Sequence, residues 1–342
     1  NLHFEVTGGN VLIEKITFRN FNFTEGNGGA ILWTGNEGIL KNCNFNNNKA
    51  VLAGAIFWQG VNGILSSSTF INNTVSSYGG GVMWYAANGV LTDCTFSNNY
   101  AGADGGAINW GDMGFNGTIS DSIFIDNVAD QFGGGVLWYG NNGVLFDSTF
   151  KGNSASSGGG VYWIGANGTL SGSTFTNNTV SEAGAGIRWM GNNGNLINSI
   201  LTSNIANYCG GGIDIGSVNF IIKGSNFLNN YAELGGGVNW WNENGYIVSS
   251  TFTRNTAKIM GGAVLWNVIG HMVNCTFNNT KWIKSNENEI YAKKDLTING
   301  GKGIVGLFIN GTLSSVSIVI LNNETYYYPP NTNINFHKQN NV

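Results

Sequence analysis

The chain has 342 residues and a formal net charge of −4, with 15 basic residues and 10% charged residues in total. So few lysines and arginines leave no basic stripe, which excludes nucleic acid as a partner. No run of about 20 apolar residues is present, so we expect no segment that spans a membrane. The 53 glycines and the many asparagines exclude helical repeats, which need good helix formers.

A repeated unit begins near the N-terminus, and its first clear copy spans residues 28–50. In this copy Ile31 and Trp33 form one short apolar run, Leu40 lies in a second and Phe45 in a third. The tryptophan slot is filled by Trp33, Trp58, Trp84, Trp110, Trp138, Trp163, Trp189, Trp240 and Trp266, with Ile215 in the remaining copy. A fixed period of this length is typical of a solenoid built from stacked units.

The three runs of each copy alternate apolar and polar residues, which is typical of β-strands rather than helices. Glycine and asparagine between the runs suit turns that need a positive φ. Three short strands per copy of about 26 residues, repeated in register, predict one coil of a right-handed parallel β-helix. We therefore expect an all-β solenoid of about 11 coils, in which equivalent slots lie about 4.8 Å apart.

The slots that hardly vary between copies are expected to point into the solenoid. These are the slots of Ile31, Trp33, Leu40 and Phe45, so the tryptophan column should be internal. The asparagine slot, represented by Asn48, is expected at a turn. There the stacked amides can bond to one another and to the turn backbone, because each has two donors and an acceptor.

The four cysteines are expected to be free thiols that fill small buried spaces. Cys43, Cys94 and Cys275 occupy one slot of the repeat, and Cys209 lies in another. Cys43 and Cys94 are two coils apart, about 9–10 Å at the strand spacing. That exceeds the limit of about 7 Å between the Cα atoms of a disulfide.

Three carboxylates on successive coils form the one candidate metal site, with Ca²⁺ as the candidate ion. Asp93, Asp121 and Asp147 occupy the same slot, about 4.8 Å apart per coil. Oxygen ligands at such a spacing suit Ca²⁺. Other copies hold Ser67 or Gly172 in this slot, which favours a permissive turn position instead.

The slots on either side of the tryptophan vary freely, and we expect them to face outward. Many of them are aromatic, aliphatic or methionine, and a contiguous exposed apolar patch is typical of a contact surface. A linker that is two residues longer than its equivalents adds Met113 and Phe115 beside this stripe. The candidate binding residues are Phe57, Met83, Tyr85, Met113, Phe115, Leu137, Tyr139, Tyr162, Ile164, Met190 and Trp241.

The repeat pattern ends near residue 280. Residues 1–280 are predicted to form the β-helix domain, and residues 281–342 a β-rich cap and linker. A solenoid exposes unpaired strand edges at its last coil, and a polar terminal unit is the expected cover. The chain opens at Asn1 without methionine, which indicates a fragment of a longer secreted protein.

The motif G-G-A-I paired with F-x-x-N resembles the repeat of chlamydial polymorphic outer-membrane proteins. The longer form G-G-A-I-x-W is similar to adhesin-like surface proteins of methanogenic archaea, over roughly residues 10–280. The stretch from residue 311 to residue 331 also resembles the segment that follows such repeats in the archaeal proteins. The resemblance implies a cell-surface β-helix used for attachment, with no shared catalytic residues.

These observations predict an extracellular, cell-surface or cell-wall-associated adhesin domain, monomeric as a fragment of a larger protein and without a cofactor. Its partner is expected to be a glycan or protein of a host or neighbouring cell, because aromatic faces suit sugars. One alternative is a structural stalk, and a second is a polysaccharide lyase or glycoside hydrolase, as many parallel β-helices are. Catalysis needs paired acids or a basic partner, whereas His3, His271 and His337 are scattered, so we expect no enzyme.

Overall fold

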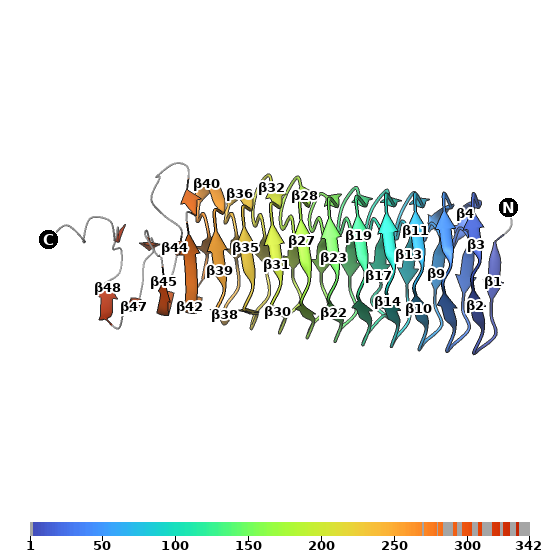
Figure 1. The fold of residues 1–342 in the computed structure, drawn as a ribbon, viewed down its shortest axis with the longest axis horizontal. Helices are drawn as coiled ribbons and strands as arrows, with labels where there is room; N and C mark the ends of the chain where they lie inside the picture. The colour runs from blue at the N-terminus through green and yellow to red at the C-terminus, as the bar shows by residue number, and fades with distance from the viewer. Residues whose placement is uncertain are drawn as a thin grey trace.

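The computed structural model describes residues 3–268, 270–278, 280–282, 290–292, 296–302, 307–309, 317–321, 324–328 and 333–334. These residues form a straight rod of stacked coils with the two termini at opposite ends (Figure 1). The described elements are all strands, and none of the described residues forms a helix. Within this part of the chain there is accordingly no apolar helix of membrane-spanning length.

Each of the ten coils between residues 4 and 260 contains four short strands, so the prediction of three strands per coil was wrong. In the first clear repeat, β5 (Ile31–Trp33) carries the tryptophan, and β6 (Ile39–Lys41) and β7 (Asn44–Asn46) follow it. The additional strand is β8 (Lys49–Leu52). Its equivalent in the next coil, β12 (Thr74–Val75), has only two residues, which is too short for an alternating pattern to identify.

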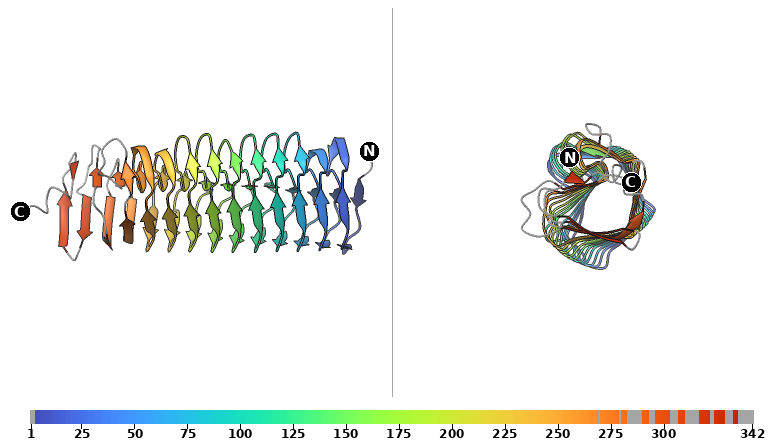
Figure 2. Two further views of the ribbon diagram at one scale, coloured as in Figure 1. Left: turned by 45° about the horizontal axis from the view of Figure 1, so that its top comes forward. Right: turned by 90° about the vertical axis from the view of Figure 1, so that its left-hand side faces the viewer.

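The strands of successive coils pair in parallel and form three long sheets, which superimpose along the rod axis (Figure 2). We name each sheet after the residue type whose side chain most often points from that sheet into the core. The tryptophan sheet has 14 strands: β1 (Phe4–Val6), β5, β9 (Ile56–Trp58), β13 (Val82–Trp84), β17 (Ile108–Trp110), β21 (Val136–Trp138), β25 (Val161–Trp163), β29 (Ile187–Trp189), β33 (Ile213–Ile215), β37 (Val238–Trp240), β41 (Val264–Trp266), β44 (Ile290–Ala292), β46 (Leu307–Ile309) and β49 (Asn333–Ile334).

The phenylalanine sheet has 24 strands, because β6 and β7 and their equivalents belong to one sheet. They are β2 (Leu12–Glu14), β3 (Thr17–Arg19), β6, β7, β10 (Ile64–Ser66), β11 (Thr69–Ile71), β14 (Val90–Thr92), β15 (Thr95–Ser97), β18 (Thr118–Ser120), β19 (Ile123–Ile125), β22 (Val144–Phe146), β23 (Thr149–Lys151), β26 (Thr169–Ser171), β27 (Thr174–Thr176), β30 (Asn195–Ile197), β31 (Ile200–Thr202), β34 (Ile221–Lys223), β35 (Asn226–Leu228), β38 (Gly245–Val248), β39 (Thr251–Thr253), β42 (Gly270–Asn278), β45 (Leu296–Lys302), β47 (Ser317–Leu321) and β48 (Glu324–Tyr328).

The alanine sheet has 11 strands and closes each coil. They are β4 (Asn22–Asn27), β8, β12, β16 (Tyr100–Ala101), β20 (Val128–Ala129), β24 (Ser154–Ala155), β28 (Thr179–Val180), β32 (Ile205–Ala206), β36 (Tyr231–Leu234), β40 (Thr256–Met260) and β43 (Lys281–Trp282).

The tryptophan column is internal, as predicted. All nine tryptophans of the column are 0% exposed. Strand pairing places Trp33 directly beside Trp58, and their rings stack with centroids 4.4 Å apart. The phenylalanine column stacks in the same way, with 4.7 Å between the rings of Phe45 and Phe70. The core is therefore a set of continuous side-chain columns that run along the rod.

The asparagine column forms the predicted ladder, and its members are fully buried. The Oδ1 atom of Asn127 accepts hydrogen bonds from both the backbone N–H and the Nδ2 of Asn99, at 3.0 and 2.9 Å. The Nδ2 of Asn127 donates in turn to Asn153 and to the carbonyl of Phe96. Each amide thus uses its donors and its acceptor between neighbouring coils, which satisfies buried groups that would otherwise cost free energy.

The four cysteines are free and buried, as predicted. Cys43 and Cys94 each lie against backbone carbonyls of their own and the preceding coil. Burial raises the pKa of the Cys94 thiol to about 12. The thiols are therefore protonated packing groups at neutral pH.

Parallel stacking continues beyond residue 280, where β44 pairs with β41 and β45 with β42. Antiparallel pairs then replace it, between β47 and β48 and between β46 and β49. Antiparallel pairing gives the last parallel strands a partner from within the same chain. The predicted domain boundary at residue 280 and the predicted linker stay predictions, because much of the segment lies outside the described residues.

Candidate functional site

The outer face of the tryptophan sheet is the candidate site. Its strands are three residues long, and the first and third residues point inward, so the middle residue points outward. Turns that lead from the alanine sheet back to the tryptophan sheet flank this outer face on one side. The residues that follow each tryptophan flank it on the other. A groove along the rod results, and its polar residues gather in two cavities.

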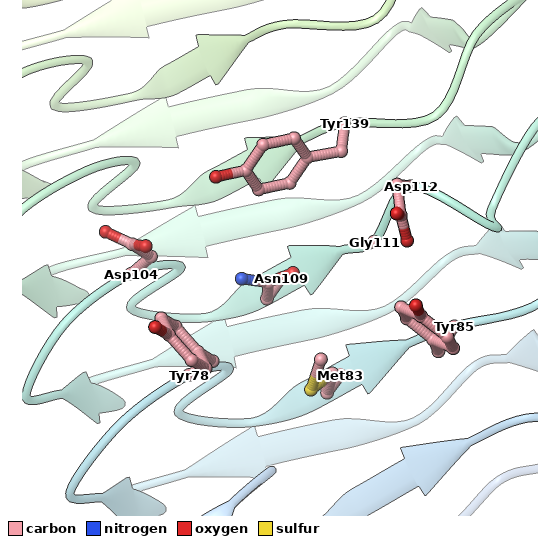
Figure 3. Close-up of a pocket in the computed structure, with 8 residues that line it drawn as sticks. All are labelled: Tyr78, Met83, Tyr85, Asp104, Asn109, Gly111, Asp112 and Tyr139. Carbon is pink, nitrogen blue, oxygen red and sulfur yellow. The ribbon is translucent and has the colours of Figure 1, made fainter.

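The first of these, which we call the tyrosine cavity, has a volume of about 310 Å³. Figure 3 shows Asn109 and Met83 on its floor, with Tyr78 and Asp104 on one flank and Tyr85 and Asp112 on the other. Tyr139 reaches across the cavity from the next coil, with its hydroxyl group toward the Asp104 flank (Figure 3). The lining residues are Tyr78, Met83, Tyr85, Asp104, Asn109, Gly111, Asp112 and Tyr139.

A glycine makes room for one of the three tyrosines. A Cβ atom on Gly111 would lie 2.6 Å from the Cδ2 atom of Tyr85, so the ring of Tyr85 lies directly against the backbone of the next coil. In the neighbouring coil Tyr139 occupies the slot equivalent to Gly111. The alternation of tyrosine, glycine and tyrosine keeps the space above Asn109 open.

The electrostatics of the tyrosine cavity are acidic. Asp104 is 7% exposed, and its Oδ1 accepts the backbone N–H of Phe132 at 3.1 Å. Burial raises the pKa of the Asp104 carboxyl above its usual range, and the hydrogen bond from Phe132 opposes this effect. The pKa of Tyr139 is also raised, first by burial and then by the negative charge of Asp104. A hydrogen bond to Asp112 raises the pKa of Tyr85.

The side chain of Asn109 on the cavity floor is buried and has no partner. It is 4% exposed, and within the described residues no hydrogen bond to it is formed. Its amide atoms are accessible from the cavity rather than fully enclosed by protein. The outward slot of the neighbouring strands holds Met83 and Leu137, so an apolar residue would fit this position. The amide is therefore a polar group that faces the cavity and is available to a ligand.

A second cavity of about 380 Å³ lies farther along the same groove and contains a buried ion pair. The Nε of Arg188 lies 3.6 Å from Oδ2 of Asp214, which is 1% exposed. Asn239 and Trp241 donate to Oδ1 of Asp214 at 2.6 and 2.9 Å. Burial raises the pKa of the Asp214 carboxyl, and the Arg188 guanidinium opposes that shift. The lining residues are Glu182, Ala183, Arg188, Tyr208, Cys209, Asp214 and Trp241, and we call this space the arginine cavity.

Only some residues of the predicted apolar stripe are exposed. Met83, Tyr85 and Tyr139 line the tyrosine cavity. Phe57 is 7% exposed and Leu137 is fully buried, so the prediction that these two are exposed was wrong. Both side chains point away from the core, but the turns and side chains that flank the groove cover them.

The remaining stripe residues are spread along the groove. Met113 and Phe115 are exposed and form an apolar cavity of about 300 Å³ with Tyr85. Tyr162 lies under the guanidinium of Arg188, 5.7 Å from it. The other members lie beside the groove or in the arginine cavity, and they are Ile164, Met190 and Trp241.

Sequence reasoning missed Tyr78, Asp104, Asn109 and Asp112. Tyr78 and Asp104 lie in turns, where the repeat gives no fixed slot. One signal for Asn109 was present, because it is an amide in a slot that is apolar in the coils on either side. No pattern in the sequence indicated that Tyr78 and Asp104 lie close to Asn109.

The predicted metal site at Asp93, Asp121 and Asp147 stays a prediction. All three residues are exposed at turn positions with φ of 55°, 49° and 50°. Aspartate tolerates this left-handed conformation better than most residues, which explains its recurrence in this slot. No group of three or more histidine, cysteine, aspartate or glutamate residues in the described part of the chain is arranged to hold a metal ion.

Comparisons with known proteins give the family and one similar structure. The model of the family described as "Right handed beta helix region" matches residues 4–175. No curated protein matches the chain. One similar solved structure is an arginine-to-alanine mutant of AlyGC, an alginate lyase of the PL6 family. Its TM-score is 0.37 at 11% sequence identity, over 96% of this chain and 54% of that chain.

These findings change two expectations from the sequence. The right-handed parallel β-helix is confirmed, whereas the narrower resemblance to archaeal adhesin-like proteins stays a prediction. The prediction that the chain is not an enzyme is withdrawn, because the fold brings acidic and basic side chains together in one cavity. That prediction rested on the lack of grouped acids and bases in the sequence. The fold nevertheless places Arg188, Asp214 and Tyr208 from separate coils in one cavity.

Proposed function

The chain belongs to the right-handed β-helix family, and from this premise we propose that it is an extracellular adhesin domain that binds a glycan. The binding site in this proposal is the tyrosine cavity, and the partner is a glycan on a host or neighbouring cell. The cavity residues come from successive coils, so a bound oligosaccharide would lie along the rod. Low charge and abundant asparagine, glycine, serine and threonine support a place outside the cell.

The observation that carries the proposal is the unpartnered amide of Asn109 among three tyrosines. A sugar hydroxyl both donates and accepts hydrogen bonds, so one hydroxyl can satisfy either end of an amide. The apolar faces of a sugar ring pack on aromatic rings such as Tyr85 and Tyr139. A concave site with aromatic walls and a few convergent polar groups is typical of small-ligand binding.

A glycan array with the purified chain and an Asn109→Leu variant tests this proposal. We expect the native chain to bind a narrow set of oligosaccharides. The variant should bind the same oligosaccharides at least about tenfold more weakly, which corresponds to a loss of about 1.4 kcal/mol in binding free energy. Asn195→Ile is the matched control, because the equivalent position on the next coil of the phenylalanine sheet is already Ile221. No binding by the native chain, or equal binding by both variants, would reject the site.

A second candidate function is cleavage of the bound glycan, and the arginine cavity is the observation that favours it. A guanidinium, two carboxylates and the Tyr208 hydroxyl share this space. Carboxylates and a tyrosine hydroxyl can act as general acids and bases, and a guanidinium can stabilise a developing negative charge. Incubation with polysaccharides and measurement of chain length tests this function. Shortening that is lost in Arg188→Met but kept in Arg254→Met, an exposed arginine elsewhere, would establish it. Unchanged chain length across acidic, neutral and uronic-acid polymers would remove it.

A further inference from the structure

We propose that the tyrosine cavity holds a positively charged ammonium group, so that the ligand is a glycan with free amino groups. This inference rests on the proposed function and names the class of sugar. Its evidence is an unbalanced charge, a set of aromatic rings around it, and the unpartnered amide beneath it.

The unbalanced charge is that of Asp104. The residue is 7% exposed, its carboxylate accepts one backbone hydrogen bond, and no basic residue lines the cavity. The four ion pairs formed among the described residues do not involve it. Buried carboxylates in proteins are normally paired, because removal from water destabilises the charge. A cationic ligand group would supply the missing partner.

The rings of Tyr78, Tyr85 and Tyr139 lie around the same space (Figure 3). The face of an aromatic ring attracts a cation within about 6 Å of its centre, and aromatic cages for ammonium groups use this attraction. Asp112 adds a second carboxylate at the opposite flank from Asp104. The ring arrangement favours an organic ammonium over a metal ion, which needs converging oxygen ligands rather than ring faces.

The same geometry disfavours other sugar classes. A carboxylated or sulfated glycan would bring its negative charge next to Asp104 and Asp112, and like charges at short distance repel. A neutral sugar would satisfy Asn109 but would leave Asp104 without a counter-charge. An amino sugar can do both, because its hydroxyl groups and its ammonium group lie on one ring.

Calorimetric titration with glucosamine oligosaccharides and with fully N-acetylated oligosaccharides of the same length tests the inference. At about pH 6 we expect the amino form to bind the native chain at least about tenfold more tightly. Asp104→Asn should reduce this ratio to about one. Asp130→Asn is the matched control, because it removes the same charge from an exposed carboxylate that pairs with Tyr100 outside the cavity. It should leave the ratio unchanged.

The outcomes separate this inference from the proposed function. Equal affinity for the two oligosaccharides would overturn the ammonium assignment and leave glycan binding intact. Binding of neither oligosaccharide would overturn the glycan proposal and with it the amino-sugar assignment. Tetramethylammonium distinguishes the source of the cation: if it binds with a strength that depends on Asp104 while neither oligosaccharide does, the cavity takes ammonium groups that are not part of a sugar, and the amino-sugar assignment is wrong.

Discussion

The ring of Phe220 packs edge-on against the indole of Trp189, with 4.9 Å between the ring centroids and 63° between the planes. Phe220 also contacts Trp240 from the other side, so it bridges the gap that Ile215 leaves in the tryptophan column. In the preceding coil the equivalent of Phe220 is Gly194, where an added Cβ would lie 2.5 Å from the indole nitrogen of Trp189. In the coil of Ile215, an isoleucine and a phenylalanine thus stand where the neighbouring coils have a tryptophan and a glycine.

This exchange predicts a specific pattern of stability. Phe220→Ala should lower the free energy of unfolding by about 3–5 kcal/mol, because it leaves a cavity in the column. Ile215→Trp alone should cost about 1–3 kcal/mol through overpacking against Phe220. The double change Ile215→Trp with Phe220→Gly should recover most of the loss. Urea unfolding of the four proteins measures this, and additive losses in the double variant would contradict the exchange.

The asparagine ladder should contribute more to stability than the exposed asparagines do. Asn127→Ala leaves two N–H groups of Asn99 and the carbonyl of Phe96 without their partner. At about 1–3 kcal/mol for each buried unsatisfied group, we expect a loss of at least about 3 kcal/mol. Asn142→Gly is the control, because Asn142 is an exposed asparagine with φ of 57° and glycine adopts that conformation freely. Similar melting temperatures for the two variants would show that the ladder is not stabilising.

Two buried asparagines in the same column of the tryptophan sheet should respond in opposite ways. Asn109→Leu replaces an amide without a protein partner by an apolar side chain between Met83 and Leu137, and we expect the free energy of unfolding to rise by about 1–2 kcal/mol. Asn239→Leu removes an amide that donates to Asp214 and accepts from Asn267, and it should lower stability by about 1–3 kcal/mol. Chemical unfolding of both variants checks the signs. A destabilised Asn109→Leu would mean that the amide has a structural partner.

The buried thiols should weaken the fold in alkali. Because burial raises the pKa of Cys94 from its usual value of 9.0 to about 12, the fold favours the protonated thiol. Its stability contribution is complete below about pH 9 and is lost as the pH rises toward 12. Over this window the native chain should lose about 1.4 kcal/mol per pH unit more than Cys94→Ser. Serine occupies this slot in the adjacent coils, at Ser68 and Ser122, so the variant should fold. Parallel pH profiles of the two proteins would show that Cys94 does not titrate in the unfolding.

The sequence by itself determined the columns of the solenoid. A slot that recurs every coil and keeps Trp33, Phe45 or Asn48 must stack on its copies, since parallel strands repeat at a fixed spacing. The alternation of apolar and polar residues along each strand showed which side chains point inward. The number of coils between Cys43 and Cys94 showed that these two residues are too far apart for a disulfide. The fourth strand escaped detection because two residues per coil are too few for a period to be recognised.

Only the tertiary structure decided where the outward residues meet. Tyr78 and Asp104 belong to turns, and their distance from Asn109 depends on the path of those turns over the sheet, which strand periodicity does not specify. Leu137 faces outward by alternation and is nevertheless buried, because neighbouring coils cover it. Arg188 and Asp214 are 26 positions apart and pair because equivalent slots of β29 and β33 lie side by side. The repeated sequence determines which side chains pack inside the solenoid. The arrangement of its outer side chains depends on contacts between residues that differ from coil to coil.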